Sequence, residues 1–247
     1  IFNAIHGSPG ENGIMQNYFS KHGIPITGCG SKESELTFNK IECLKFLRNK
    51  GIKTAKSISV KKNTEIKSEK IQKEIGFPCF IKASKSGSSF GVYKVYNKEE
   101  FIDCLNSAFE IDDEILVETF IKGREFSIGV LTYKNKVTVL PITEIIASND
   151  FFDYEAKYEG KSQEITPAKI DHKLKDKLNK ISKDIYNIID LKGFSRSEFI
   201  VNKDGIYFLE TNTVPGLTSE SILPQQAQHA GISLEDLFVN SIYEVIK

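Results

Sequence analysis

The chain has 247 residues, 40% of them hydrophobic, and equal numbers of basic and acidic residues, 33 of each. A chain of this length and composition can bury a substantial core in one or two domains. Its zero net charge gives no basic excess for binding nucleic acid or an anionic membrane surface. No apolar run approaches the roughly 20 residues of a membrane span, so we expect neither partner.

The cysteines, at positions 29, 43, 79 and 104, are scattered and form no Cys-x-x-Cys pair. This spacing argues against a disulfide framework or a zinc site and favours buried thiols in a reducing compartment. The opening residues lack the basic start and long apolar centre of a signal peptide. Because the sequence begins without methionine, directly in an expected strand at 1–5, we expect a fragment that lacks an amino-terminal part.

Hydrophobic periodicity in the first half predicts strands and helices that alternate along the chain. A glycine-bearing loop at 6–13 follows the first expected strand. The expected helices lie at about 14–22, 37–50, 67–75 and 98–109, and further strands at 56–60, 79–82, 91–96 and 114–120.

The second half begins with two β-rich runs between 125 and 146, which predict an antiparallel hairpin because the polar turn 133–137 joins them. The polar, aromatic-containing segment 147–167 has little periodicity, and loops of this length are often functional lids. A helix at 171–189, strands at 197–202 and 206–211, and a final pair of helices complete the prediction.

The stretch CFIKASKSGSSFGV, residues 79–92, places Lys82 in a short apolar strand that runs into a loop of small residues. Successive backbone N–H groups in such a loop form a concavity that binds phosphate oxygens, and serine hydroxyls add donors. The pattern is not a P-loop, because the lysine precedes the glycines. A plain hairpin with a Gly/Ser turn accounts for these residues equally well.

Two later strands end in side chains that carry oxygen. Glu210 and Asn212 are two residues apart, so both leave one face of their strand, and Arg196 and Glu198 have the same spacing one strand earlier. Magnesium prefers such oxygen ligands together with phosphates and waters. The alternative is a solvated strand face that carries acids by chance.

A third candidate is ILVETFIKGREF, residues 115–126, where an apolar strand ends near Glu118 and a turn at Gly123 leads to Glu125. Such a linker can offer backbone groups to a nucleotide base and a carboxylate to ribose hydroxyls. The alternative is a simple connection between strands.

Six motifs stand in the order found in the D-alanine–D-alanine ligases of the ATP-grasp superfamily, and together they resemble that family over essentially the whole chain. They are HGSPGENG, FIKASKSGSSFGV, VETFIKGREF, FFDYEAKY, RSEF and LETNTVPGLTSESILP. The resemblance implies an α/β (α+β) ATP-grasp fold with two subdomains that grip ATP. It places the remnant of a Rossmann-like substrate-binding domain at 1–30, the central subdomain at 31–118, and the C-terminal subdomain at 119–247, with a lid at 147–167.

The activity that this resemblance implies is ligation of two D-alanine molecules for peptidoglycan synthesis in the cytoplasm. ATP phosphorylates the carboxylate of one D-alanine, and the amine of the second attacks the acyl phosphate, releasing ADP and phosphate. Two Mg²⁺ or Mn²⁺ ions and a homodimeric assembly are further implications of the resemblance.

The resemblance also assigns roles to individual residues. Those expected at ATP are Lys40, Lys82, Ser89, Glu118, Phe120, Ile121, Glu125 and Lys157. Those expected at the metal ions are Glu198, Glu210 and Asn212, and those expected at the D-alanine molecules are His6, Ser221 and Ile222. Arg196 and the backbone at Gly216 are expected to stabilise the tetrahedral oxyanion. Ser88 and Tyr158 are expected to tie the lid to the substrate through a family glutamate that this sequence lacks.

The chain departs from the family pattern at Glu198, where many members have aspartate; glutamate keeps the ligand type but changes its reach. His6, without the resemblance, is equally explained as the cap of a loop. Two other functions remain open: a ligase that joins D-alanine to D-lactate or D-serine, and a catalytically silent module that binds MgATP. Tyr158 favours the dipeptide, because ester-forming members have a different lid at this position.

Overall fold

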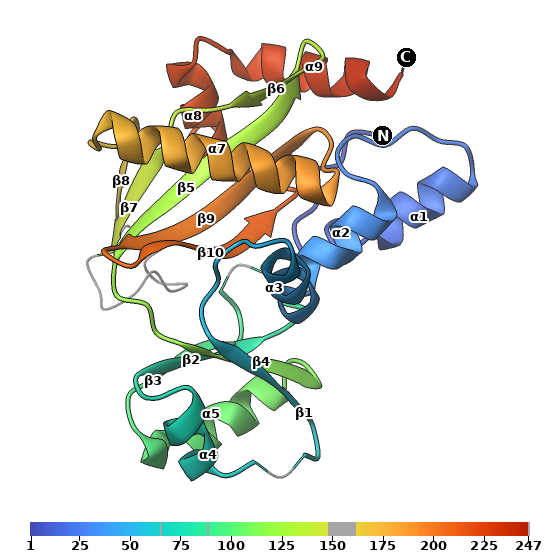
Figure 1. The fold of residues 1–247 in the computed structure, drawn as a ribbon. Coiled ribbons are helices and arrows are strands. Elements are labelled where there is room, and N and C mark those ends of the chain that lie inside the picture. Colours follow the sequence, from blue (N-terminus) through green and yellow to red (C-terminus); the bar gives the residue numbers. More distant parts are fainter. Residues whose placement is uncertain (65, 88, 148–161, 247) are drawn as a thin grey trace.

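The computed structural model describes residues 1–64, 66–87, 89–147 and 162–246, and contains two β-sheets with helices packed against them (Figure 1). One sheet has four strands in the order β1-β4-β2-β3. The other has six, in the order β10-β9-β5-β7-β8 with β6 paired to β5. The ladders in both sheets are antiparallel. None of the helices in these ranges is long and apolar enough to cross a membrane.

The four-stranded sheet is covered on one face by two helices (Figure 1). Its strands are β1 (Ser57–Lys61), β2 (Cys79–Ala83), β3 (Val92–Val95) and β4 (Glu114–Thr119), and its helices are α4 (Ser68–Glu74) and α5 (Lys98–Phe109). Cys79, Ile81 and Ala83 are buried against these helices. Because side chains alternate along a strand, Phe80 and Lys82 point to the opposite face.

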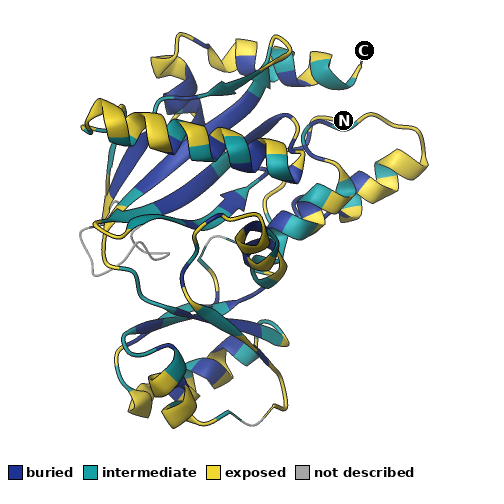
Figure 2. Ribbon diagram, in the orientation of Figure 1, coloured by how far each residue is buried: buried dark blue, intermediate teal, exposed yellow. Residues whose placement is uncertain are grey.

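The six-stranded sheet is covered on one face by the long helix α7 (His172–Ile189), which buries its inner side and exposes its outer side (Figure 2). Its strands are β5 (Arg124–Tyr133), β6 (Lys136–Val139), β7 (Thr143–Ala147), β8 (Ser162–Ile165), β9 (Phe194–Asn202) and β10 (Gly205–Asn212). Phe126 and Phe199 join Leu178 of α7 in the core. Residues of α8 (Ile222–His229) and α9 (Leu234–Val245) pack with Leu131 of β5 in a separate cluster.

Three short helices, α1 (Ile14–Lys21), α2 (Ser31–Phe38) and α3 (Lys40–Asn49), precede the sheets. The helix predicted at 37–50 forms from Lys40 to Asn49, so the prediction is wrong only at its start, where Asn39 separates α2 from α3. Its backbone is extended, and its side chain accepts a hydrogen bond from the Glu42 N–H at 3.2 Å, which caps α3. Leu44 and Leu47 of α3 belong to the same core as α7.

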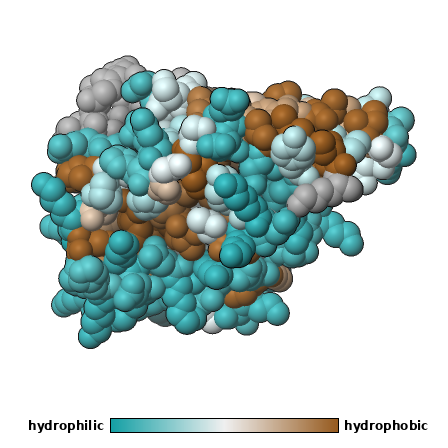
Figure 3. Space-filling view, turned by 90° about the horizontal axis from the view of Figure 1, so that it is seen from above, coloured by the Kyte–Doolittle hydropathy of each residue, from teal (hydrophilic) through white to brown (hydrophobic). Residues whose placement is uncertain are grey.

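The predicted strand at 1–5 is also wrong, since these residues belong to neither sheet. Their backbone pairs with a loop instead: Thr27 N–H donates to Ile1 O and Asn3 N–H donates to Thr27 Oγ1, both at 2.9 Å. Exposed apolar side chains gather in this opening segment, in α1 and in α9, and Figure 3 shows apolar residues clustered on one part of the face seen from above.

The remaining element predictions are close to the structure. The hairpin β5–β6 turns at Lys134 and Asn135, which have φ of 48° and 64°, the left-handed pair that a tight hairpin needs.

The segment 147–167, expected to be loop, instead includes β8, which pairs with β7. Residues 148–161 of the expected lid lie outside the described ranges.

Candidate active site

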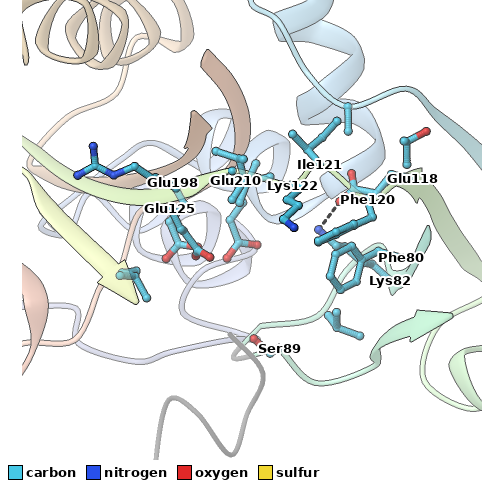
Figure 4. Close-up of a pocket in the computed structure, with 18 of the residues that line it drawn as sticks. Phe80, Lys82, Ser89, Glu118, Phe120, Ile121, Lys122, Glu125, Glu198 and Glu210 are labelled. Atoms are coloured by element: carbon cyan, nitrogen blue, oxygen red, sulfur yellow. Dashed lines mark ion pairs between the residues drawn. The ribbon is translucent and has the colours of Figure 1, made fainter. Parts of the chain in front are cut away.

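A cavity of about 570 Å³ lies between the two sheets and is called here the inter-sheet cavity (Figure 4). Both sheets and the linker between them line it, with Phe80, Lys82, Glu118, Phe120, Ile121, Glu125, Glu198 and Glu210 among its residues. The volume is within the range of small-molecule and cofactor sites, about 300–1,000 Å³. The sequence predictions at 79–92, 115–126 and 196–212 thus converge on one space.

Lys82 lies at the four-stranded side of the cavity and forms an ion pair with Glu118 of the adjacent strand β4 (Figure 4). Burial by itself lowers the pKa of Lys82, but the charge and hydrogen bond of Glu118, together with the charges of Glu210 and Glu125, hold the pKa above its usual value. The side chain therefore carries a full positive charge inside the cavity, 16% exposed.

Lys40 supplies a second positive charge from the start of α3. Its Nζ donates to Ser86 O at 2.5 Å and lies 3.8 Å from Glu210 Oε2. The side chain thus connects the Gly/Ser loop to the end of β10. Ser89 of that loop lines the inter-sheet cavity, whereas Ser88 lies outside the described residues.

The linker side of the cavity is aromatic. The rings of Phe80 and Phe120 lie 5.9 Å apart between centroids, and Lys94 Nζ lies 4.1 Å from the Phe120 centroid. Ile121 follows in the linker, and Glu125 enters β5 opposite Ile145. Flat apolar side chains next to a carboxylate suit a planar base attached to a sugar with hydroxyl groups.

Glu198 of β9 and Glu210 of β10 are direct cross-strand neighbours, and Arg196 and Asn212 form the next such pair. A register shift between Phe208 and Glu210 produces this arrangement. Without that irregularity, strict alternation would send Glu210 to the same side as Phe208, which is buried in the core.

Two carboxylates directly opposite one another repel unless a cation lies between them. The donor set of Glu198, Glu210 and the Asn212 amide matches what magnesium takes from a protein when phosphates and waters complete its shell. Asn212 Oδ1 also accepts a hydrogen bond from Val214 N–H at 2.8 Å, which fixes the amide. Within the described ranges there is no cluster of three or more His, Cys, Asp and Glu residues that could hold a metal ion.

Arg196 is held in place from two sides. Its Nη1 donates to Glu198 Oε1 at 2.5 Å and to Ser127 Oγ at 3.0 Å. Gln226 of α8, fully buried, donates to the Ser127 carbonyl at 2.8 Å and thereby joins α8 to the same point of β5.

The loop after β10 brings the predicted substrate residues close together. Ser221 precedes α8 and Ile222 begins it, and a Cβ built on Gly216 would meet Ser221 Oγ at 2.6 Å. His6 lies near Val214 and Arg196, where desolvation of the ring and the positive charge of Arg196 lower its pKa. The imidazole is therefore neutral at pH 7.

Lys157 and Tyr158, predicted at ATP and at the lid, lie with Ser88 outside the described residues. The sequence predictions overlooked two residues of this region, Glu11 and Ser127. Glu11 stands in the quoted motif HGSPGENG, where an acid in a glycine-rich loop next to His6 was the available signal. Ser127 gave no such signal, because a serine within an apolar strand looks like an ordinary sheet position.

Two antiparallel sheets that enclose a nucleotide-sized cavity, with lysines on one side and paired acids on the other, define an ATP-grasp enzyme. The crystal structure of the D-alanine–D-alanine ligase from Bacillus anthracis complexed with ATP has a TM-score of 0.85 and 31% identity, covering 99% of this chain and 77% of that one. The VanG D-Ala:D-Ser ligase from Enterococcus faecalis has a TM-score of 0.87 and 34% identity, covering 98% and 71%.

The sequence comparisons define the family. Residues 46–243 match the family model described as the D-Ala D-Ala ligase C-terminus. The D-alanine–D-alanine ligase of Flavobacterium johnsoniae is 54% identical over 242 residues, 98% of this chain and 75% of the relative. That of Phocaeicola vulgatus is 43% identical over 239 residues, 96% and 74%. The chain belongs to the D-alanine–D-alanine ligase family, and the predicted family and fold are confirmed.

Proposed function

We propose that this protein uses ATP to join two D-alanine molecules into D-alanyl-D-alanine through an acyl-phosphate intermediate. The observation that carries the proposal is the convergence of Lys40, Lys82 and the opposed pair Glu198–Glu210 around one nucleotide-sized cavity. The relatives at 43–54% identity that are named D-alanine–D-alanine ligases favour D-alanine as acceptor over D-serine or D-lactate.

The first task of such a site is to let a carboxylate approach a triphosphate, although both groups are negatively charged. Lys40 and Lys82 place two ammonium groups at the cavity, and Ser89 stands in the loop that faces them. These cations, with Lys157 from the lid, offset the repulsion before the reaction begins. Glu198, Glu210 and Asn212 would hold two Mg²⁺ or Mn²⁺ ions, which neutralise phosphate charge when bound.

The nucleotide base is assigned to the aromatic side of the cavity. The backbone from Glu118 to Ile121 and the ring of Phe120 would frame adenine, and Glu125 would accept hydrogen bonds from the ribose hydroxyls. The Glu118 carboxylate is already paired with Lys82, so its contribution to the base comes through its main chain.

The amino-acid substrates are assigned to the far end, next to Arg196. The guanidinium of Arg196 and the Gly216 backbone would stabilise the oxyanion that forms when the amine attacks the acyl phosphate. The N-terminus of α8, which begins at Ile222 after Ser221 without a side-chain cap, suits the carboxylate of the second D-alanine. His6 would contact the first D-alanine, and Ser88 and Tyr158 would join the lid to it.

The rest of the proposal follows from family membership. It comprises a role in peptidoglycan synthesis, a cytoplasmic location, a homodimeric assembly, and the division into segments 1–30, 31–118 and 119–247 with a lid at 147–167.

The deciding experiment is a coupled assay of ADP release by the full-length protein with and without D-alanine, followed by product analysis. We expect ADP release to depend on D-alanine and the product to be D-alanyl-D-alanine. A silent nucleotide-binding module would bind MgATP without D-alanine-dependent release. A preference for D-lactate or D-serine when the acceptors compete at neutral pH would replace the proposed acceptor.

Ser127→Ala is expected to lower kcat about tenfold, because Arg196 loses one of its two hydrogen-bond acceptors and no longer holds its position. The KM for ATP should stay unchanged, since Ser127 does not line the inter-sheet cavity. Steady-state kinetics at saturating D-alanine measure both values. Ser195→Ala is the matched control: a buried serine of β9 that has no contact with Arg196 among its hydrogen bonds. Equal kcat in the two variants contradicts the prediction.

A further inference from the structure

Gln226 of α8 is fully buried, and its carboxamide hydrogen-bonds to the six-stranded sheet through both of its N–H groups and through its carbonyl. Nε2 donates to the Ser127 carbonyl at 2.8 Å and to Thr143 Oγ1 at 2.9 Å, and Oε1 accepts from Gly129 N–H at 2.9 Å. These three partners fix both the position of the amide and the direction in which it faces. A buried polar side chain with its partners satisfied specifies one arrangement of the elements that it joins.

This amide lies at a gap along one edge of β5. The strand pairs with β7 up to Ser127 and with β6 from Val130 onward. Between these two ladders, Gln226 donates to the Ser127 carbonyl and accepts from the Gly129 N–H, so it takes the place of a neighbouring strand. A Cβ built on Gly129 would meet Gln226 Oε1 at 2.6 Å, and glycine at this position therefore lets the amide approach the backbone. The helix is joined to the strand by hydrogen bonds of defined direction.

The apolar contacts of α8 define its position less sharply than this amide does. Leu223 and Ala227 pack in the cluster that contains Leu131 of β5. Burial of apolar surface stabilises the contact but has no preferred direction. The strand β5 is itself held by its long ladder to β9. Loss of the Gln226 amide is therefore expected to displace the helix and not the strand.

Two groups assigned to the reaction lie at the ends of this connection. The helix α8 begins at Ile222, about 6 Å along the helix axis from Gln226, and its N-terminus is assigned to the carboxylate of the second D-alanine. Ser127, whose carbonyl accepts from Gln226, also accepts at its Oγ from Arg196 at 3.0 Å. Arg196 is assigned to the oxyanion, so Gln226 sets the distance between the group that holds the second D-alanine and the group at the reacting carbon.

We infer that Gln226 is a positioning residue for the second D-alanine, because it fixes the N-terminus of α8 relative to Arg196. The inference rests on the proposed function and adds to it a residue that acts through α8 and not by contact with a substrate. The amine of the second D-alanine must come within about 3–3.5 Å of the acyl carbon while its carboxylate stays on α8. A misplacement of about 1 Å in such a geometry can cost 10²-fold in rate.

Hydroxylamine separates this role from general damage to the site, because it has no carboxylate for α8 to hold. Its nitrogen attacks the acyl phosphate of the first D-alanine and loses a proton to solvent, while the bond from the acyl carbon to the phosphate oxygen breaks. The products are D-alanine hydroxamate and phosphate. Hydroxamate and dipeptide arise from the same acyl phosphate next to the same Arg196, but only the dipeptide requires the N-terminus of α8. The ratio of hydroxamate to dipeptide therefore reports on α8.

The test is Gln226→Met in the full-length protein, assayed with ATP, D-alanine and a fixed concentration of hydroxylamine. Methionine is unbranched and fills the space of the amide, but it leaves the Ser127 carbonyl and the Gly129 N–H without this partner. We expect the ratio of hydroxamate to dipeptide and the KM for the second D-alanine to rise about tenfold, with the KM for ATP unchanged. Gln228→Met, at an exposed position of the same helix, is the matched control and should keep the wild-type ratio. A wild-type ratio in Gln226→Met overturns the inference.

Gln226→Glu is the conservative variant. It keeps the shape of the side chain and an oxygen for the Gly129 N–H, and burial favours its neutral form, which has one O–H for the Ser127 carbonyl. Its ratio of hydroxamate to dipeptide should lie between those of the wild type and Gln226→Met. If Gln226→Met does not fold, Gln226→Glu decides: a raised ratio supports the inference, and a wild-type ratio overturns it.

Ser127→Ala separates α8 from Arg196. It removes the hydroxyl that accepts from Arg196, which both products need, so the two rates should fall together and their ratio should stay at the wild-type value. A ratio raised as far as in Gln226→Met would mean that the effect comes from Arg196 and not from α8, and the inference would be wrong. A wild-type enzyme that releases no ADP with D-alanine, with or without hydroxylamine, overturns the proposed function itself, which is a separate result.

Discussion

Glu210→Gln is expected to lose D-alanine-dependent turnover by about 10³-fold or more while the protein stays folded. The change removes one of the two carboxylates that face each other across β9 and β10, and with it the charge that attracts a divalent cation. Stability should change little, because the Glu210 side chain is 37% exposed and its contact with Lys40 is long, at 3.8 Å. Ion pairs of this kind contribute about 0–1 kcal/mol.

The measurement combines the ADP-release assay with calorimetric titration of ATP at increasing magnesium concentration. Wild-type affinity for ATP should rise with magnesium, and the affinity of the variant should respond far less. Glu69→Gln removes an exposed acid from α4, which packs on the four-stranded sheet, and is the control for a general effect of lost charge. Wild-type turnover in Glu210→Gln would remove the metal assignment for this residue.

The sequence predicted the local structure around the site well, because local signals dominate there. The alternation Cys79, Ile81, Ala83 identifies the buried face of β2 and leaves Lys82 on the other face. Glu210 and Asn212 do share one face, as their spacing predicted. Spacing did not predict which face of the strand these two side chains occupy. The irregularity after Phe208 turns Glu210 away from the core, and no residue type in YFLET indicates that irregularity.

Sequence patterns did not predict the contacts between segments that are distant in the chain. Lys82 and Glu118 meet because β2 and β4 are neighbours with a defined register, which composition and periodicity do not give. The break at Asn39 was overlooked because apolar residues continue at helical spacing on both sides of it. The first five residues are apolar like a strand, yet their hydrogen bonds go to a loop and not to a sheet.

Lys82→Met is expected to lower both activity and stability, for different reasons. Turnover should fall about 10²–10³-fold, because a full positive charge at the phosphate side of the cavity is lost. The free energy of unfolding should fall by roughly 3 kcal/mol, because Glu118 is left as a buried carboxylate without its cation. That value is at the low end for a broken buried pair, since the adjoining cavity admits water.

The double variant Lys82→Met/Glu118→Gln separates the two effects. Neutralising Glu118 removes the unpaired charge, so most of the lost free energy of unfolding should return, as judged by urea denaturation of the single and double variants. Turnover should not return, because the charge that faces ATP is still absent. Recovery of activity together with stability would mean that Lys82 serves only to neutralise Glu118, and the assignment of Lys82 to the phosphates would then be wrong. A stable but inactive double variant assigns the ammonium group to the substrate, since the fold no longer needs it.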